Sequence, residues 1–349
     1  MKVVHIESGI GNQMLSYCEL LALQHANPEE VCYIENIIYD IPECNDVICQ
    51  WNGYELERVF GIHASNVKEL FDDATWQSVK QDIADSRFWD RNWNYPVYFT
   101  DAFRKHGLAL TNIRGDFEGE NATLMTKESS SFKSRLRKTY PGHLLKRVLN
   151  RVNRNKILRR HMEAEQLFLS TDEDLYTGQR LSFKFKGNHI SRIESKIREV
   201  FTFPALADET NIRAMEEITE NNSVAIHARR GDMLGYNYDC YQFGYFKRAV
   251  RYMKKHVENP LFIFFCDPGS VDWCKENLAI FGLKAGKDRI RFVDWNAGEQ
   301  SYIDMQLMAK CKHQIITRSS FGWWGAFLNE NPLKITCSPD FEINTTHHF

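Results

Sequence analysis

The sequence of 349 residues lacks the features that mark several large classes of protein. It has no run of about 18 apolar residues and no signal peptide, so neither a membrane-spanning helix nor a secretion signal is expected. A net charge of −2 gives no case for a nucleic-acid-binding protein. The nine Cys form no CxxC pair and no zinc-finger spacing with His. We therefore expect buried free thiols in a reducing cytoplasm, without disulfides or zinc.

The length of the chain predicts two domains, because a single core stops growing near about 250–300 residues. The composition, 43% hydrophobic and 26% charged residues, is that of an ordinary globular protein. We expect an N-terminal α/β domain over residues 1–205, carrying a basic helical insert at about 128–163. A C-terminal Rossmann-like domain is expected over residues 206–349.

The start of the chain reads as a strand, a glycine turn and a helix. The apolar run Lys2–Glu7 predicts a short buried strand, and the run from Met14 to His25 predicts a helix. Gly9 and Gly11 lie between them. They either let backbone N–H groups approach a ligand or let the helix pack closely on the sheet. The third glycine of a dinucleotide fingerprint is absent.

A regular alternation of strands and helices begins at Ser223 and indicates a parallel sheet covered on both faces. We expect strands at 224–226, 261–266, 289–293 and 314–317, and helices at 245–256, 271–281, 301–311 and 321–328. Elsewhere, residues 97–100 and 108–114 are expected as strands, residues 186–203 as a helix, and residues 133–160 as a basic amphipathic helix or helix pair. In parallel sheets the ligand binds at the carboxyl ends of the strands.

The segment His227–Asp232 directly follows one of these strands. It places one imidazole and the guanidinium groups of Arg229 and Arg230 at a strand end, and Arg suits phosphate because it donates two hydrogen bonds at once. The alternative interpretation is an Arg–Asp surface pair, which stabilises little. We favour the phosphate interpretation.

The segment Arg318–Gly325 also follows a strand and opens a helix. Ser319 and Ser320 are suited to cap that helix, and a helix N-terminus attracts anions. An ordinary cap followed by two tryptophans of the core is an equal alternative. Together with Arg229, the capped helix can hold a diphosphate.

Four acidic residues complete the candidate set. Asp294 ends a predicted strand and Asp304 lies on the next helix, and either carboxylate can accept hydrogen bonds from the edge of a guanine. A turn or helix-cap role is as plausible for each. The only Asp-x-Asp, at Asp172 and Asp174, follows Ser170-Thr171 and is interpreted as the acidic start of a helix. We therefore expect no metal.

Several of these segments together resemble glycosyltransferase family 11, the α-1,2-fucosyltransferases of bacteria and animals. The resemblance rests on the segments Gly9–Met14, His227–Asp232, Asp267…Asp272–Leu278 and Ser301–Met308 through Ser319–Asn329. It implies a GT-B fold with two Rossmann-like domains facing across a cleft, and GDP-fucose as donor. Inversion at the fucose and independence of metal are also implied.

The resemblance further implies roles for single residues. Arg229 matches the arginine that grips the β-phosphate, with Arg230 in support. The remaining donor contacts would be His227, Asp294, Ser319, Ser320, Phe321 and Gly11. Asn12 would face the fucose. For the base that takes the acceptor proton, Glu7 and Asp232 are candidates, and the base stays unassigned.

This chain departs from the family pattern at three places. Residues 178–185 match the usual inter-domain segment poorly, which leaves the acceptor open beyond a family expectation of the 2-hydroxyl of a galactose. Arg318 stands where Asn is usual, and Gly322 replaces a common Ser.

The basic stretch 133–160 has two interpretations, a solvated helix face or contact with an anionic membrane where lipid-linked glycans are built. Two other functions also remain open. One is transfer from another nucleotide sugar, and the other is glycan binding without catalysis.

Overall fold

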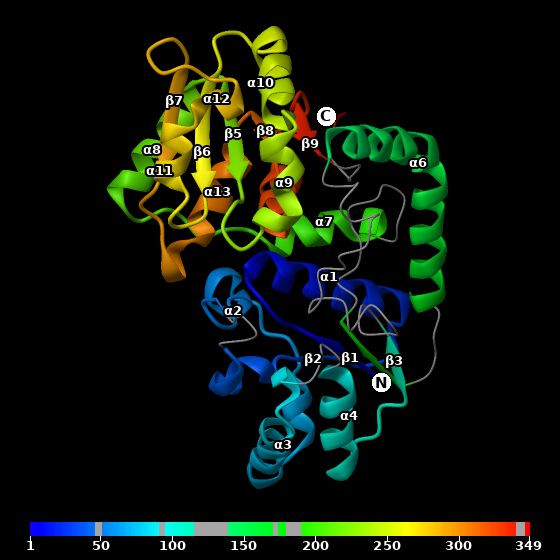
Figure 1. The fold of residues 1–349 in the computed structure, drawn as a ribbon. Helices are drawn as coiled ribbons and strands as arrows, with labels where there is room; N and C mark the ends of the chain where they lie inside the picture. The colour runs from blue at the N-terminus through cyan, green and yellow to red at the C-terminus, as the bar shows by residue number, and fades with distance from the viewer. Residues whose placement is uncertain (46–50, 91–94, 115–138, 170–173, 179–189, 340–345) are drawn as a thin grey trace. The chain divides into compact units, whose positions relative to one another are not determined.

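The computed structural model describes residues 1–45, 51–90, 95–114, 139–169, 174–178, 190–339 and 346–349 (Figure 1). The chain divides into two compact units. The first comprises the described residues within Met1–Ser129, Ile157–Phe183 and Gly187–Thr202, and the second those within Ser130–Lys156, Lys184–Lys186 and Phe203–Phe349. Each unit is built on its own parallel sheet, so the expected α/β class with two Rossmann-like units is confirmed.

The first unit contains a four-stranded sheet in the order β2-β1-β4-β3. Its strands are β1 (Lys2–His5), β2 (Cys32–Glu35), β3 (Asn112–Arg114) and β4 (Leu175–Thr177), all paired in parallel. The predicted first strand is confirmed, and every residue of β1 is buried because it pairs on both sides. Asp174 directly precedes β4, so the interpretation of this acidic residue as part of a helix start is wrong. Asp172 lies outside the described residues.

The helices of the first unit are α1 (Ile10–Ala26), α2 (Leu56–Phe60), α3 (Asp73–Ser86), α4 (Tyr95–Lys105) and α7 (Ile190–Val200), with short 3-10 turns at Ile37–Asp40, Pro42–Cys44, Val67–Leu70 and Phe88–Asp90. The strand predicted at 97–100 is wrong, because these residues belong to α4. Phe99, Ala102 and Phe103 are buried at helical spacing, and this packing outweighs the strand preference of Val, Tyr and Phe. The strand predicted at 108–114 is confined to β3.

Helix α6 (Tyr140–Leu169) forms the described part of the basic stretch, as one helix and not a pair. Thr139 caps it, since its hydroxyl accepts a hydrogen bond from the backbone N–H of Gly142 at 3.2 Å. Residues 128–138 of the expected insert lie outside the described residues.

The second unit contains a parallel sheet in the order β10-β9-β8-β5-β6-β7. Its strands are β5 (Ser223–Ala228), β6 (Leu261–Cys266), β7 (Arg289–Val293), β8 (His313–Ile315), β9 (Thr336–Ser338) and β10 (His347–His348). Its helices are α8 (Glu209–Glu220), α9 (Leu234–Gln242), α10 (Tyr245–His256), α11 (Val271–Glu276), α12 (Leu278–Phe281), α13 (Tyr302–Lys310) and α14 (Ser320–Leu328). The predicted alternation is confirmed here, although the helix expected at 271–281 is interrupted at Asn277.

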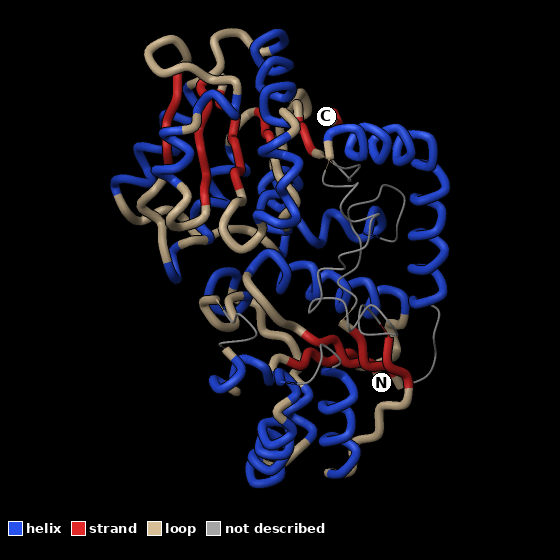
Figure 2. The backbone as a smooth tube through the Cα atoms, in the orientation of Figure 1, coloured by secondary structure: helices blue, strands red, loops and turns tan. Residues whose placement is uncertain are grey.

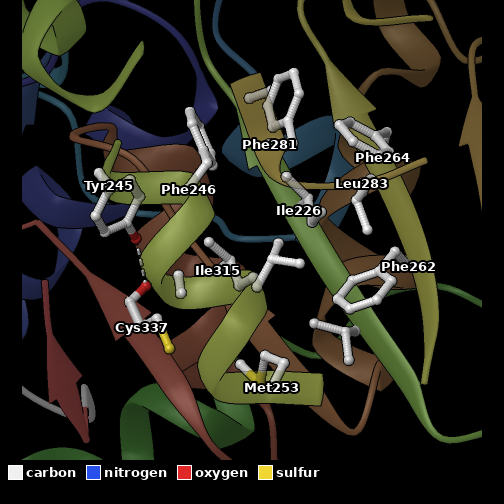
Figure 3. Packing of buried hydrophobic residues seen from close by; sticks show 14 of the residues in the cluster. Ile226, Tyr245, Phe246, Met253, Phe262, Phe264, Phe281, Leu283, Ile315 and Cys337 are labelled. Atoms are coloured by element: carbon white, nitrogen blue, oxygen red, sulfur yellow. Dashed lines mark hydrogen bonds between the residues drawn. The ribbon is translucent and has the colours of Figure 1, made fainter. Parts of the chain in front are cut away.

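Helices cover both faces of this sheet (Figure 2). Side chains along β5 and β6 alternate between two clusters, as the twofold repeat of a strand requires. One cluster joins the sheet to α9, α10 and α12, and the other joins it to α8 and α13. In the first cluster the hydroxyl of Tyr245 on α10 donates to the carbonyl of Cys337 at 2.9 Å, which ties the helix to β9 (Figure 3).

The structure also bears on the expected free thiols and on the expectation of no membrane-spanning helix. The eight cysteines in the described residues are free thiols, and all but Cys266 are buried, while Cys49 lies outside the described residues. None of the helices in the part of the chain that the structure describes is long and apolar enough to span a bilayer.

Candidate functional site

The candidate site is the edge of the second sheet at which β8, β5, β6 and β7 end. These strands are neighbours and run parallel, so the loops that follow them leave the sheet at the same edge. Eight of the ten predicted site residues belong to this unit, and Gly11 and Asn12 belong to the first unit.

His227 is the last but one residue of β5 and is 4% exposed. Its ring stacks on Phe321 with centroids 5.8 Å apart, so the structure brings these two predicted residues together. Burial, reinforced by the positive charge of Arg229, lowers the pKa of His227 to about 3. The imidazole is therefore uncharged at neutral pH.

Arg229 follows β5 and supplies the positive charge of the site. Its guanidinium lies 2.9 Å from the carboxylate of Asp232, and its backbone N–H donates to the hydroxyl of Thr317 at 3.3 Å. The side chain of Asp232 is half exposed. The side chain of Arg229 is only 17% exposed, and Asp232 orients its guanidinium.

Arg230 is held against the next loop of the same edge. Its guanidinium carbon lies 4.1 Å from the ring centroid of Trp273 on α11, at cation–π distance. Its Nε is buried and has no hydrogen-bond partner among the described residues. Trp273 therefore holds the Arg230 guanidinium at this edge of the sheet.

Asp267, directly after β6, fixes the turn that carries the two arginines. Its carboxylate accepts hydrogen bonds from the backbone N–H groups of Arg230 at 2.6 Å and Gly231 at 2.9 Å, and from the hydroxyl of Ser270 at 2.6 Å. A Cβ on Gly231 would lie 2.7 Å from this carboxylate, so the turn needs glycine. The sequence prediction gave Asp267 no role. Its position directly after the apolar strand β6 is the sequence feature that could have marked Asp267 as a candidate.

Asn237 on α9 joins the loops after β5 and β8 and was missed altogether. Its buried amide donates to the carbonyls of Arg229 at 3.1 Å and Arg318 at 3.3 Å, and accepts from the N–H of Arg318 at 2.9 Å. No sequence signal identifies it, because an Asn within a polar helix is ordinary.

The loop after β8 leads into helix α14. Ser319 takes the N-cap position as predicted, but among the described residues its hydroxyl accepts no capping hydrogen bond. Ser320 and Phe321 form the first turn, and Trp323 and Trp324 are buried as core residues. The start of α14 thus adjoins His227 through the contact of Phe321.

Arg318 stands where the family pattern usually has Asn. In the described contacts, its side chain binds α9 and not the start of α14. Its guanidinium forms two hydrogen bonds with the carboxylate of Asp239, at 2.5 and 2.9 Å. Burial opposes ionisation of Asp239, but the pair with Arg318 holds the pKa of that carboxyl below its ordinary value. Arg318 therefore braces the loop on α9, and its charge is neutralised there.

The two acidic candidates lie near the end of β7, two strands away from β5. Asp294 is half exposed and pairs with Lys275 at 3.0 Å. Asp304, in the first turn of α13, accepts a hydrogen bond from Asn296 at 2.8 Å. Burial raises the pKa of Asp304 to about 7 against this hydrogen bond, and the charge of Asp294 adds to the shift. Guanine recognition by either carboxyl stays a prediction.

Gly11 and Asn12 lie in the first turn of α1, Gly11 buried and Asn12 half-buried. The turn is held from within its own unit. Gln13 donates to the carbonyls of Ser8 and Gly53, each at 2.8 Å, and the N–H of Ile10 donates to the carboxylate of Glu55 at 3.1 Å. The carboxylate of Glu55 thus already accepts one of the N–H groups at the start of α1. Roles for Gly11 and Asn12 toward the donor stay predictions.

The chain is similar to several known glycosyltransferases. The family model described as Glycosyl transferase family 11 matches residues 62–338. An alpha-1,2-colitosyltransferase of Escherichia coli is 28% identical over 57% of this chain and 68% of its own length. A galactoside alpha-(1,2)-fucosyltransferase 1 of Saimiri sciureus is 28% identical over 30% of this chain, and this match spans only 28% of that relative. The crystal structure of fucosyltransferase NodZ from Bradyrhizobium aligns with a TM-score of 0.43 at 11% identity, covering 93% of this chain and 91% of that one.

Proposed function

Because the chain belongs to glycosyltransferase family 11, we propose that this glycosyltransferase transfers L-fucose from GDP-β-L-fucose to a hydroxyl of an acceptor glycan, with inversion. The observation that carries the proposal is the pair of loops after β5 and β8, joined by Asn237. They hold Arg229 and the start of α14 at the edge where parallel sheets bind ligands.

The chemistry requires stabilisation of the departing GDP. Fucose transfer builds positive charge on the sugar and negative charge on the leaving diphosphate. Fixed donors aimed at that charge lower the barrier without rearranging during the reaction. Arg229, oriented by Asp232 at 2.9 Å, and the N–H groups at the start of α14 supply such donors. We therefore propose transfer without a metal ion.

The remaining site residues are proposed to contact the donor or to orient Arg229. His227 and Phe321 line the donor site beside Arg229, and Asn12 contacts the fucose. Asp232 is bound to Arg229, which favours an orienting role over that of the base. The base stays unassigned.

The acceptor proposed is a glycan with a terminal galactose, fucosylated at its 2-hydroxyl. The names of two relatives support an α-1,2 linkage, and one of them names a galactoside. We further propose that the enzyme acts in the cytoplasm at the inner face of the cell membrane, on a lipid-linked acceptor. The basic stretch without acidic residues between Glu128 and Glu163 supports contact with that face.

A donor screen tests the reaction. Release of GDP from GDP-fucose, measured with and without galactose-terminated acceptors, is expected to depend on the acceptor. A donor of colitose is the second candidate, favoured by the first relative's name. Faster turnover of that donor would replace fucose in the proposal. No turnover of any nucleotide sugar would favour a glycan-binding protein without catalysis.

Replacement of Arg229 tests the mechanism. Arg229→Ala removes a donor aimed at the leaving group, so kcat is expected to fall by about 10²–10³. Arg213→Ala is the matched control, because this exposed arginine of α8 pairs only with Glu209 in the described contacts. Thermal unfolding of both variants checks that the fold is intact. A folded Arg229→Ala variant with wild-type kcat contradicts the mechanism.

A further inference from the structure

Helix α6 exposes a stripe of large apolar side chains. The exposed fractions of these side chains are 39% for Leu144, 55% for Leu145, 59% for Val148, 48% for Leu149 and 76% for Val152. Single exposed apolar residues are common on soluble proteins, but a contiguous group marks an interaction surface.

The five residues of the stripe belong to the part of α6 in the second unit, on the side of the helix opposite to its contact with that unit. At 3.6 residues per turn the five side chains span roughly 140° of the helix circumference. His143 lies on the opposite side and is buried, with its ring centroid 4.9 Å from that of Phe243 and its Nδ1 3.5 Å from the carboxylate of Asp239. The helix is therefore anchored by one side while its apolar side meets solvent.

Basic residues border the stripe. Lys146 and Arg151 are exposed beside it, and Lys156 follows one turn beyond Val152. The sequence holds no acidic residue between Glu128 and Glu163. An apolar stripe flanked by Lys and Arg is the pattern of helices that lie in the interface of an anionic membrane.

We propose that the apolar stripe of α6 binds the surface of a bilayer that contains anionic lipids. Leu144, Leu145, Val148, Leu149 and Val152 enter the boundary between headgroups and acyl chains, and the neighbouring basic side chains contact lipid phosphates. Charge favours this partner over a second copy of the chain, because two such helices would bring like charges together.

Flotation with vesicles tests the proposal. The wild-type chain is expected to float with vesicles of phosphatidylcholine and phosphatidylglycerol, and not with phosphatidylcholine alone. Added salt is expected to weaken binding, because it screens the basic residues. The double substitution Val148→Asp/Val152→Asp is expected to lower the partition coefficient by about tenfold or more, because each change puts a charge in the apolar boundary.

Leu333→Asp provides the matched control. Leu333 is 81% exposed and lies outside α6, so the same chemical change there is expected to leave flotation unaltered. All of these positions are exposed, and thermal unfolding checks each variant. Wild-type protein that ignores anionic vesicles at low salt overturns the proposal. So does a folded double variant that floats like wild type, or a dimer in light scattering that this double variant dissociates.

Discussion

At the scale of single residues, the site depends on a close approach between His227 and Gly322. A Cβ built on Gly322 lies 2.3 Å from Nδ1 of His227, far inside contact distance. The ring of Phe321 stacks on the same imidazole, with the ring centroids 5.8 Å apart. Glycine at 322 therefore lets α14 begin directly against β5. This gives a physical reason for one departure of the chain from the family pattern.

Gly322→Ala tests this approach. Both residues are buried, so the added methyl must displace the imidazole or the helix, and we expect a loss of about 1–3 kcal/mol in the free energy of unfolding. GDP affinity is expected to fall as well. Gly235→Ala is the control, since a Cβ there meets no atom within 4 Å, and its stability should stay within about 1 kcal/mol of wild type. Equal stability of the two variants in chemical denaturation contradicts the account.

The candidate residues that the sequence indicates are those whose chemistry is distinctive, and the residues that hold their loops carry no such signal. Arg229 and His227 were identifiable because a guanidinium and an imidazole at a strand end are uncommon. Asp267 and Asn237 act through hydrogen bonds to backbone groups distant in sequence. Only the folded sheet brings those groups together. For Arg318, no sequence pattern reveals that Asp239 neutralises its charge.

At the scale of elements, the edge of the sheet is a set of loops tied to one another. Asp267 at the end of β6 binds the turn after β5, and Asn237 of α9 binds the loops after β5 and β8. Because the ties run between neighbouring strands, the strand order fixes the position of Arg229. Rigid elements of this kind place catalytic groups more accurately than an isolated loop does.

Asp267→Asn tests the tie between β6 and β5. The amide retains one acceptor oxygen and presents an NH₂ group where the other oxygen accepted hydrogen bonds. At least one buried donor is therefore left unpaired, and we expect about 1–3 kcal/mol lower stability together with weaker GDP binding. Asp272→Asn, on a side chain that is 92% exposed, is expected to change stability by no more than about 0.5 kcal/mol. Unchanged GDP affinity in a folded Asp267→Asn variant contradicts the positioning role.

The success of element prediction follows the strength of the sequence pattern. Strands β6 and β7 and helix α10 agree with their predicted bounds. A continuous apolar run marks β6, an alternation of charged and apolar residues marks β7, and a helical period marks α10. Strands β2, β4, β9 and β10 were not identified. They are two to four residues long, too short for any periodicity to show, and pairing with neighbours defines them. Helix α4 was mistaken for a strand because local propensity and tertiary packing disagree there.

At the scale of the whole molecule, each of the two units is built on its own parallel sheet. Apart from Gly11 and Asn12, the residues predicted to contact the donor fall on the second unit, whose alternation of strands and helices was also predicted. The residues that select the acceptor have no comparable signature, and residues 179–185 of the poorly matching segment lie outside the described residues. Predicted and observed secondary structure thus agree best in the second unit, and the donor-binding roles of its residues stay predictions.

The central claim is that Arg229 and its edge of the second sheet hold a nucleotide diphosphate without a metal ion. Calorimetric titration of GDP in the presence of a chelator tests it most directly. Wild type is expected to bind GDP under these conditions. Arg229→Ala is expected to bind about tenfold to a hundredfold more weakly, since a hydrogen bond to a charged group contributes about 1.5–3 kcal/mol. Loss of wild-type binding on chelation, or equal affinity of the folded variant, would contradict the claim.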